Sequence, residues 1–234
     1  MFYYYYDPTY ILVLIGVVLS LLASSKVNRT FNRYASVRSR LGLTGKEAAE
    51  KILRANGIYD VTVCHTSGKL TDHYDPRNKT LRLSDSTYNS ASVAAIGVAA
   101  HECGHAVQHA TGYAPLKIRG ALVPVANFGA SIAWPLVIIG LFIRGDLSGI
   151  LIEAGILLFL AAVLFQLVTL PVEFNASSRA VKCLETRGML YPEEIKGMKA
   201  VLRAAALTYV ASAASMILQL LRLVLITGGR RRNE

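Results

Sequence analysis

Charged residues are scarce in this sequence. They make up 17% of the 234 residues, whereas hydrophobic residues make up 53%, and the mean hydropathy is +0.40. Soluble globular domains carry about 25% charged residues, so the composition excludes an ordinary soluble domain. It indicates a polytopic membrane protein.

Cysteine is rare as well, with three residues at positions 64, 103 and 183. An odd and scattered set excludes the disulfide framework of a small secreted domain. We therefore expect free thiols, and we expect Cys103 to serve packing.

Basic residues are missing ahead of the first apolar run, which excludes the positive segment that opens a signal peptide. Tyrosines occupy positions 3–6, and the first basic residue, Lys26, follows the run. This order predicts a retained membrane anchor with an aromatic belt on its outer side.

Four apolar stretches are candidates to cross the hydrocarbon core, which takes about 20 residues. The first is short by itself, and the preceding tyrosines extend it. The predicted spans are residues 10–23, 121–143, 147–170 and 204–226.

Lys and Arg are distributed unevenly among the segments that join these spans. Most of them lie in residues 26–120 and 171–203, and the loop between the second and third spans has only Arg144. The positive-inside rule places the two basic segments on the cytoplasmic face. The same rule explains the net charge of +10, so we expect no nucleic-acid partner. The basic tail does not fit the positive-inside rule, because a fourth span would place Arg230, Arg231 and Arg232 on the outer face.

The segment after the anchor predicts helices and a small sheet. Thr44 and Glu47 have the spacing of a capping box, and Asn56-Gly57 is a stop signal for the helix that follows. Alternating residues near Val61 and at 80–84 predict two strands of a hairpin-like sheet, with a turn at 75–78 before the second strand. A helix is expected over 92–110, and a loop broken by Gly112 and Pro115 leads to the second span.

The predicted helix over 92–110 contains the sequence His101-Glu102-Cys103-Gly104-His105. Residues four apart lie on one helical face, so both imidazoles can reach one metal ion. Glu102 lies beside such an ion, where its carboxylate can take a proton from an attacking water. Gly104 removes bulk where a substrate or a neighbouring backbone approaches. The alternative is a structural helix whose histidines are hydrogen-bonded in the core.

A catalytic zinc site needs a third protein ligand. Glu173 is the strongest candidate, because the predicted topology returns it to the same face as the histidines. Pro171 can begin a helix there, with Glu173 in its first turn. The alternative is a carboxylate that favours the helix dipole. His109 lies about 6 Å further along the helix, too far for the same ion, and His65 and His73 are weaker candidates.

These residues resemble the YugP-type membrane zinc metallopeptidases, a family more distantly similar to the HtpX-type membrane proteases. The strings that carry the resemblance are SVAAIGVAAHECGHAVQH, TGYAPLKIR, LPVEFNASSRA, AAALTYVASA, DHYDP and LRLSDSTY.

The resemblance implies a glutamate-zincin with Zn²⁺ bound by His101, His105 and Glu173, and with Glu102 as general base. In the HtpX-type relatives an aspartate four residues after the ligand glutamate orients a zinc histidine. Here that position is Ser177, which can accept a hydrogen bond without a charge, and Asn175 is expected to share this role.

The sequence gives weaker indications of function for several further residues. Arg179 is either a contact for a substrate carboxylate or oxyanion or a positive-inside anchor, and His109 is expected beside the site or at the surface. The strand at 80–84 is either sheet core or an edge that pairs with an extended substrate. Arg222 and Gln219 in the fourth span suggest contact with a partner such as a second copy of the chain.

The fold class that follows is a mainly α, polytopic membrane protein with about four transmembrane helices and a small α+β zincin-like cytoplasmic lobe. Its expected parts are an anchor (1–25), a catalytic lobe with the HExxH helix (26–120), a transmembrane hairpin (121–170), a third-ligand segment (171–203), and a last span with a basic tail (204–234).

The function predicted is a membrane-bound zinc endopeptidase in the cell membrane, with polypeptide substrates that are membrane-associated or misfolded. One alternative is an intramembrane-cleaving protease, which the polar flanks Asn89, Ser90 and Gln108 argue against. The other is a non-catalytic zinc-binding scaffold, which Glu102 argues against, because a purely structural site has no use for a carboxylate that does not bind the metal.

Overall fold

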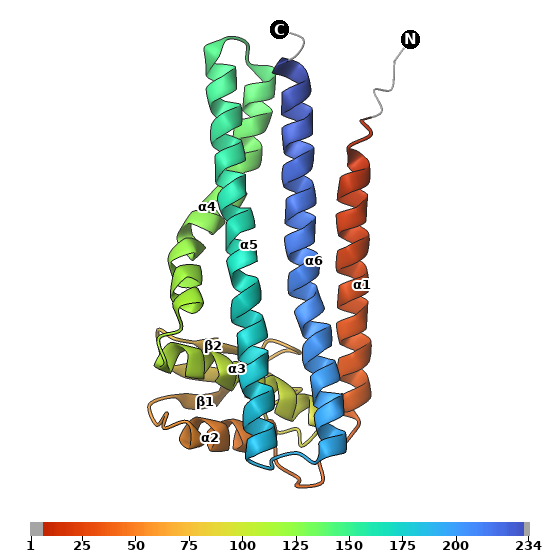
Figure 1. Cartoon of the computed structure of the whole chain (residues 1–234), viewed down its shortest axis with the longest axis vertical. Helices are drawn as coiled ribbons and strands as arrows, with labels where there is room; N and C mark the ends of the chain where they lie inside the picture. Colours follow the sequence, from red (N-terminus) through yellow and green to blue (C-terminus); the bar gives the residue numbers. More distant parts are fainter. Residues whose placement is uncertain (1–6, 232–234) are drawn as a thin grey trace. The chain divides into compact units, whose positions relative to one another are not determined.

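The computed structural model describes residues 7–231 (Figure 1). The predicted aromatic belt at 3–6 and the end of the basic tail lie outside the described residues. The elements in chain order are α1 (Tyr10–Ala35), α2 (Gly45–Ala55), β1 (Thr62–His65), β2 (His73–Asp75), β3 (Thr80–Leu83), α3 (Val93–Ala110), α4 (Ala114–Phe142), α5 (Asp146–Thr186) and α6 (Pro192–Arg231).

The fold is mainly helical with one small sheet, as the sequence predicts. Within residues 7–231, four helices are long and apolar enough to cross a membrane: α1, α4, α5 and α6. The chain divides into two compact units, which we call the membrane unit and the lobe. The membrane unit comprises Met1–Ala23, Ile118–Leu170 and Thr208–Glu234, and the lobe comprises Ser24–Lys117 and Pro171–Leu207.

Within the membrane unit, the end of α4 and the start of α5 form a helical hairpin (Figure 1). A Cβ atom added to Gly129 would lie 2.6 Å from the Leu158 carbonyl oxygen, and one added to Gly155 would lie 2.8 Å from the Ala133 carbonyl oxygen. Small residues let the backbones of membrane helices approach closely, so these glycines set the spacing of the hairpin.

The predicted loop before the second span is much shorter than expected. Helix α4 already begins at Ala114, with Pro115 in its first turn. Proline is tolerated there because the first N–H groups of a helix have no intrahelical partner. Gly112 has a positive φ of 65°, which explains why the chain turns between α3 and α4 at this residue.

Arg222 of α6 has its partners within the membrane unit. Its Nη2 atom lies 3.3 Å from Asp7 Oδ2, and its guanidinium carbon lies 4.2 Å from the centroid of the Tyr10 ring. Asp7 and Tyr10 therefore partner the Arg222 charge, whereas Arg222 Nε has no hydrogen-bond partner among the described residues. An oligomeric state stays a prediction.

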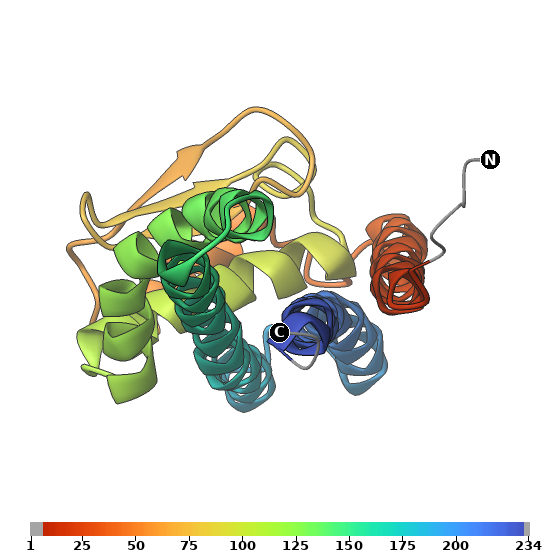
Figure 2. The ribbon, with the colours of Figure 1, turned by 90° about the horizontal axis from the view of Figure 1, so that it is seen from above.

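The lobe contains α2, α3 and the sheet, with the strands along one side of α3 (Figure 2). The predicted capping box of α2 is confirmed: Glu47 N–H donates to Thr44 Oγ1, and Thr44 N–H donates to Glu47 Oε2. Asn56 ends the helix, and Gly57 follows with a φ of 72°. Helix α2 packs against α3 with its buried alanines, Ile52 and Leu53.

The sheet differs from the predicted hairpin. Strand β3 pairs in parallel with β1 and antiparallel with β2, in the order β1-β3-β2. The two predicted strands are therefore parallel neighbours, since the long connection between them allows a crossover. The hairpin is formed by β2 and β3, whose turn is closed by Arg77 N–H and Asn78 Nδ2 donating to Asp75.

The idea that residues 80–84 offer a free edge to a substrate is wrong. Strand β3 is the central strand, and both of its edges are already paired. The side chains of Leu81 and Leu83 are fully buried, so this strand belongs to the sheet core.

Helix α5 continues through Pro171, where a new helix was expected to begin (Figure 1). The missing N–H of a proline removes one helical hydrogen bond, and long membrane helices tolerate this loss. Glu173 therefore lies in a helix interior, and the alternative that its carboxylate favours an N-terminal helix dipole does not hold.

Candidate metal centre

Helix α3 presents the two histidines of the motif on one face. Ser92 caps its first turn by accepting a hydrogen bond from Ala95 N–H at 3.2 Å. The rings of His101 and His105 have centroids 4.8 Å apart at an interplanar angle of 84°. The spacing of four residues thus brings the two imidazoles together edge to face, as the helical period requires.

Glu173 of α5 completes the group. Its Oε2 atom lies 3.2 Å from His101 Nε2 and 3.5 Å from His105 Nε2. Ligand atoms held about 2.1 Å from one ion at tetrahedral angles lie about 3.4 Å from one another. The two distances from Glu173 to the imidazoles therefore match the separations expected around a single zinc ion.

The approach of α3 to α5 depends on Gly104. A Cβ atom at this position would lie 2.5 Å from the carbonyl oxygen of Ala176. The neighbouring backbone that the glycine admits is thus α5, one turn beyond Glu173. Any larger residue would push apart the two helices that carry the site.

The residues present fit a zinc ion by their chemistry as well as by their spacing. Two imidazoles and one carboxylate are a donor set of catalytic zinc sites, which keep the fourth position open. The three ligand atoms lie within 4.8 Å of one another, and this is the single group of this kind within residues 7–231. Glu173 is 3% exposed, and a buried carboxylate of this kind needs a cationic partner.

The site is electrostatically coupled to Glu102. Burial lowers the pKa of the His105 ring, but Glu173 and the charge of Glu102 raise it more, so this pKa lies above its ordinary value. Glu102 itself is 9% exposed. A second, largely buried carboxylate therefore acts electrostatically on His105.

Each imidazole has a polar partner on its other nitrogen. His101 Nδ1 lies 3.1 Å from Ser177 Oγ, so Ser177 stands where it was expected. His105 Nδ1 lies 3.0 Å from Gln108 Oε1. The sequence prediction treated Gln108 only as a polar flank, although its spacing of three residues from His105 places it on the same helical face.

Asn175 and Arg179 lie in the same network without touching the histidines. Gln108 Nε2 donates to Asn175 Oδ1 at 3.0 Å, and Arg179 Nε donates to the same oxygen at 2.8 Å. The Arg179 guanidinium also lies over the ring of Tyr113, 5.9 Å from its centroid. Asn175 thus contacts Gln108 and Arg179 rather than a histidine.

The remaining histidines have other partners. His109 Nδ1 is hydrogen-bonded to the Tyr74 hydroxyl at 2.9 Å, His65 Nε2 lies 2.6 Å from Asp85, and His73 Nδ1 is bonded to the backbone of Thr71. Within the described chain, none of the three joins the group formed by Glu173. Cys103 is fully buried, its Sγ donates to the Ala49 carbonyl, and burial raises the pKa of its thiol well above the ordinary value.

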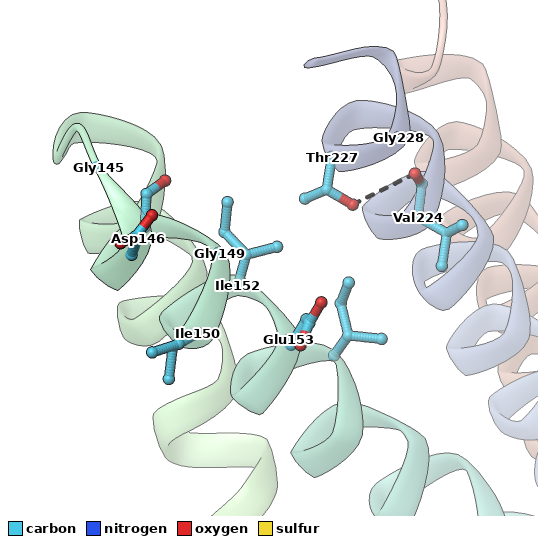
Figure 3. Close-up of a pocket in the computed structure, with 11 residues that line it drawn as sticks. Gly145, Asp146, Gly149, Ile150, Ile152, Glu153, Val224, Thr227 and Gly228 are labelled. Carbon is cyan, nitrogen blue, oxygen red and sulfur yellow. Dashed lines mark hydrogen bonds between the residues drawn. The ribbon is translucent and has the colours of Figure 1, made fainter. Parts of the chain in front are cut away.

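The membrane unit has a cavity of different character, about 680 Å³ in volume (Figure 3). Glycines, isoleucines and two acidic residues, Asp146 and Glu153, line it. Thr227 uses its hydroxyl to donate to the carbonyls of Leu223 and Val224. The described lining has no imidazole and no thiol, so this cavity lacks the imidazole pair of the candidate metal centre.

Within the described residues, four helices apolar enough to cross a membrane, an imidazole pair and a buried glutamate are features typical of a membrane metallopeptidase. The chain matches the family model described as "putative neutral zinc metallopeptidase" over residues 9–228 and belongs to that family. The "putative membrane protease YugP" of Bacillus subtilis (strain 168) is 47% identical over 223 residues, which cover 95% of this chain and 98% of the relative. No solved structure matches the chain.

Proposed function

We propose that this protein is a zinc-dependent endopeptidase that cleaves polypeptides at the cytoplasmic face of the cell membrane. The observation that carries the proposal is the group of ligand atoms from His101, His105 and Glu173. The buried Glu102 directly follows His101 on α3. The family match and the four apolar helices support a membrane peptidase. The cytoplasmic side follows from the basic segments alone.

The residues of the site have separate tasks in this mechanism. His101, His105 and Glu173 would hold the ion, and a bound Zn²⁺ supplies Lewis-acid chemistry that polarises a carbonyl and makes water acidic near neutral pH. Glu102 takes a proton from the attacking water and passes it to the leaving amine. Burial of Glu102 strengthens its interaction with the charges that develop, because few water molecules screen them.

Two features argue against the alternatives. A structural zinc site closes all four positions with protein ligands, whereas three ligands meet here and Glu102 is a further acid beside them. The motif helix α3 is not among the four apolar helices, and it belongs to the lobe together with the sheet. Both observations favour hydrolysis outside the hydrocarbon core over a scaffold or an intramembrane protease.

The test is hydrolysis of unfolded casein by the purified full chain and by Glu102→Gln, with the zinc content of both measured. We expect equal zinc content and a loss of cleavage of at least about 100-fold in the variant, the contribution of a general base. Full zinc content with no cleavage by either protein would favour the scaffold. Cleavage of membrane-embedded but not of unfolded soluble substrates would favour the intramembrane protease.

A further inference from the structure

Gln108 is a fully buried amide in a helix of mostly small and apolar residues, with 0% of its side chain exposed. All of its polar atoms nevertheless have partners. Its Oε1 faces His105 Nδ1 at 3.0 Å, and its Nε2 donates to the Val172 carbonyl at 2.8 Å and to Asn175 Oδ1 at 3.0 Å. A buried amide is costly unless it is satisfied in this way, so its presence beside a metal ligand needs a reason.

The partners fix which way the amide points. The Val172 carbonyl can only accept a hydrogen bond, so the NH₂ group of Gln108 must face it. The amide oxygen then faces His105, and because an amide oxygen can only accept, His105 must carry its proton on Nδ1. This tautomer leaves the lone pair on Nε2, the nitrogen that faces Glu173.

The orientation of the Asn175 amide, the next group in this hydrogen-bond network, is fixed in the same manner. Arg179 is always a donor, and its Nε donates to Asn175 Oδ1 at 2.8 Å. Asn175 therefore presents its oxygen to both Arg179 and Gln108. The hydrogen bonds therefore run in series from Arg179 through Asn175 and Gln108 to His105, and the donor and acceptor of each are fixed.

His101 lacks such a directional partner. Its Nδ1 lies 3.1 Å from the Ser177 hydroxyl, and a hydroxyl can donate as well as accept. The partner of His101 is thus compatible with either neutral tautomer. The two histidines that would share one ion therefore differ in their partners. His101 faces the Ser177 hydroxyl, which can donate or accept, whereas His105 faces the Gln108 amide oxygen, which can only accept.

We propose that Gln108 is a positioning residue for metal binding, which holds His105 in its metal-binding tautomer through a relay from Arg179 and Asn175. The proposal rests on the proposed zinc-peptidase function and adds how the same site is prepared for its ion. Outer partners of this kind change metal affinity by about 10- to 100-fold when they are removed. The relay connects α3 to α5, the two helices that supply the ligands.

The experiment measures the zinc affinity of the purified full chain by competition with a chelator. Gln108→Met keeps the length of the side chain and removes its hydrogen bonds, and we expect its affinity to fall by about 10- to 100-fold. Gln108→Glu keeps an acceptor oxygen for His105 Nδ1 but loses the donor to the Val172 carbonyl and Asn175 Oδ1, so we expect its affinity to stay below that of the unaltered protein. Gln219→Met makes the same chemical change on α6 in the membrane unit and should leave the affinity unchanged.

If Gln108→Met fails to fold, a second pair of variants tests the relay at Arg179, the residue furthest from His105. Arg179→Met should lower the zinc affinity by less than about 10-fold, since it acts through two further side chains. Lys182→Met removes an exposed positive charge from the same helix and should have no effect. A drop for Arg179→Met alone supports the relay, and equal affinity in both variants contradicts it.

The outcomes separate the relay from the proposed function. Zinc binding by the unaltered protein with an unchanged affinity in folded Gln108→Met would overturn the relay alone. Full zinc affinity in folded Gln108→Glu would also overturn it, because an acceptor for His105 would then suffice without the hydrogen bond that links Gln108 to Asn175. Absence of zinc binding by the unaltered protein would overturn the proposed function and the relay together.

Discussion

The membrane unit and the lobe both bring two helices into backbone contact through a glycine, but the contact has a different result in each. In the membrane unit, Gly129 faces the carbonyl of Leu158, and apolar side chains surround the contact. In the lobe, Gly104 faces the carbonyl of Ala176, and imidazoles and a carboxylate meet beside it. Close helix approach is therefore a general packing device, and the side chains one turn away decide whether it forms a site.

The largest expected effect on zinc affinity comes from removing the carboxylate ligand Glu173, which belongs to the lobe. Glu173→Ala leaves two imidazoles without a carboxylate, and we expect zinc affinity to fall by well over about 100-fold, more than for any outer partner. Glu153→Ala in the same helix is the matched control and should retain zinc. Chelator competition on the purified proteins measures both, and equal affinities would contradict the assignment of Glu173.

The two glycines offer the most direct contrast between the units. Gly104→Ala and Gly129→Ala each force a methyl group against a carbonyl, and we expect each to cost about 1–3 kcal/mol of stability. Only Gly104→Ala should also lower zinc affinity, because it moves α5 away from α3. Thermal unfolding and chelator competition give the two readouts, and a zinc defect in Gly129→Ala would break the comparison.

Ser177 tests the less constrained histidine. Ser177→Ala removes the hydroxyl beside His101 Nδ1, and we expect a fall in zinc affinity of up to about 10-fold, the low end for an outer partner. Ser177→Asp supplies a carboxylate acceptor and should raise the affinity above that of the unaltered protein. Ser178→Ala on the adjacent, exposed position is the control, and an equal loss there would contradict a role for the Ser177 hydroxyl.

The smallest expected effect concerns the lobe alone. Thr44→Ala removes the cap of α2 and should cost about 1 kcal/mol of stability, seen as a lower unfolding temperature. Zinc affinity should not change, because the side-chain hydrogen bonds of Thr44 are made with Glu47 at the start of α2. A change in affinity would mean that the stability of the lobe and the site cannot be separated.

The sequence predicts those parts of the site that depend on local spacing. The pair His101 and His105, the cap at Thr44 and the partner role of Ser177 follow from helical periodicity or from resemblance. The role of Gln108 depends on which acceptors of α5 lie opposite, so a single helix pattern cannot predict it. The path of the chain through Pro171 was missed because proline is a breaker in most helices, whereas a long apolar helix can tolerate one.

The sheet was predicted in its strands but not in its pairing. The alternating residues of β1 and β3 identify two strands, but a pattern of this kind carries no information about direction. The short strand β2 lies between them in the chain, and its pairing with β3 moves β3 to the centre. The error about a free edge at residues 80–84 follows directly from missing β2.

The measurement that tests the central claim most directly is X-ray absorption at the zinc edge on the purified full chain, with metal content determined in parallel. The account predicts one zinc per chain, with two imidazole nitrogens and one carboxylate oxygen at about 2.0–2.2 Å, and loss of the carboxylate contribution in Glu173→Ala. A sulfur ligand, or an unchanged spectrum in Glu173→Ala, would contradict it.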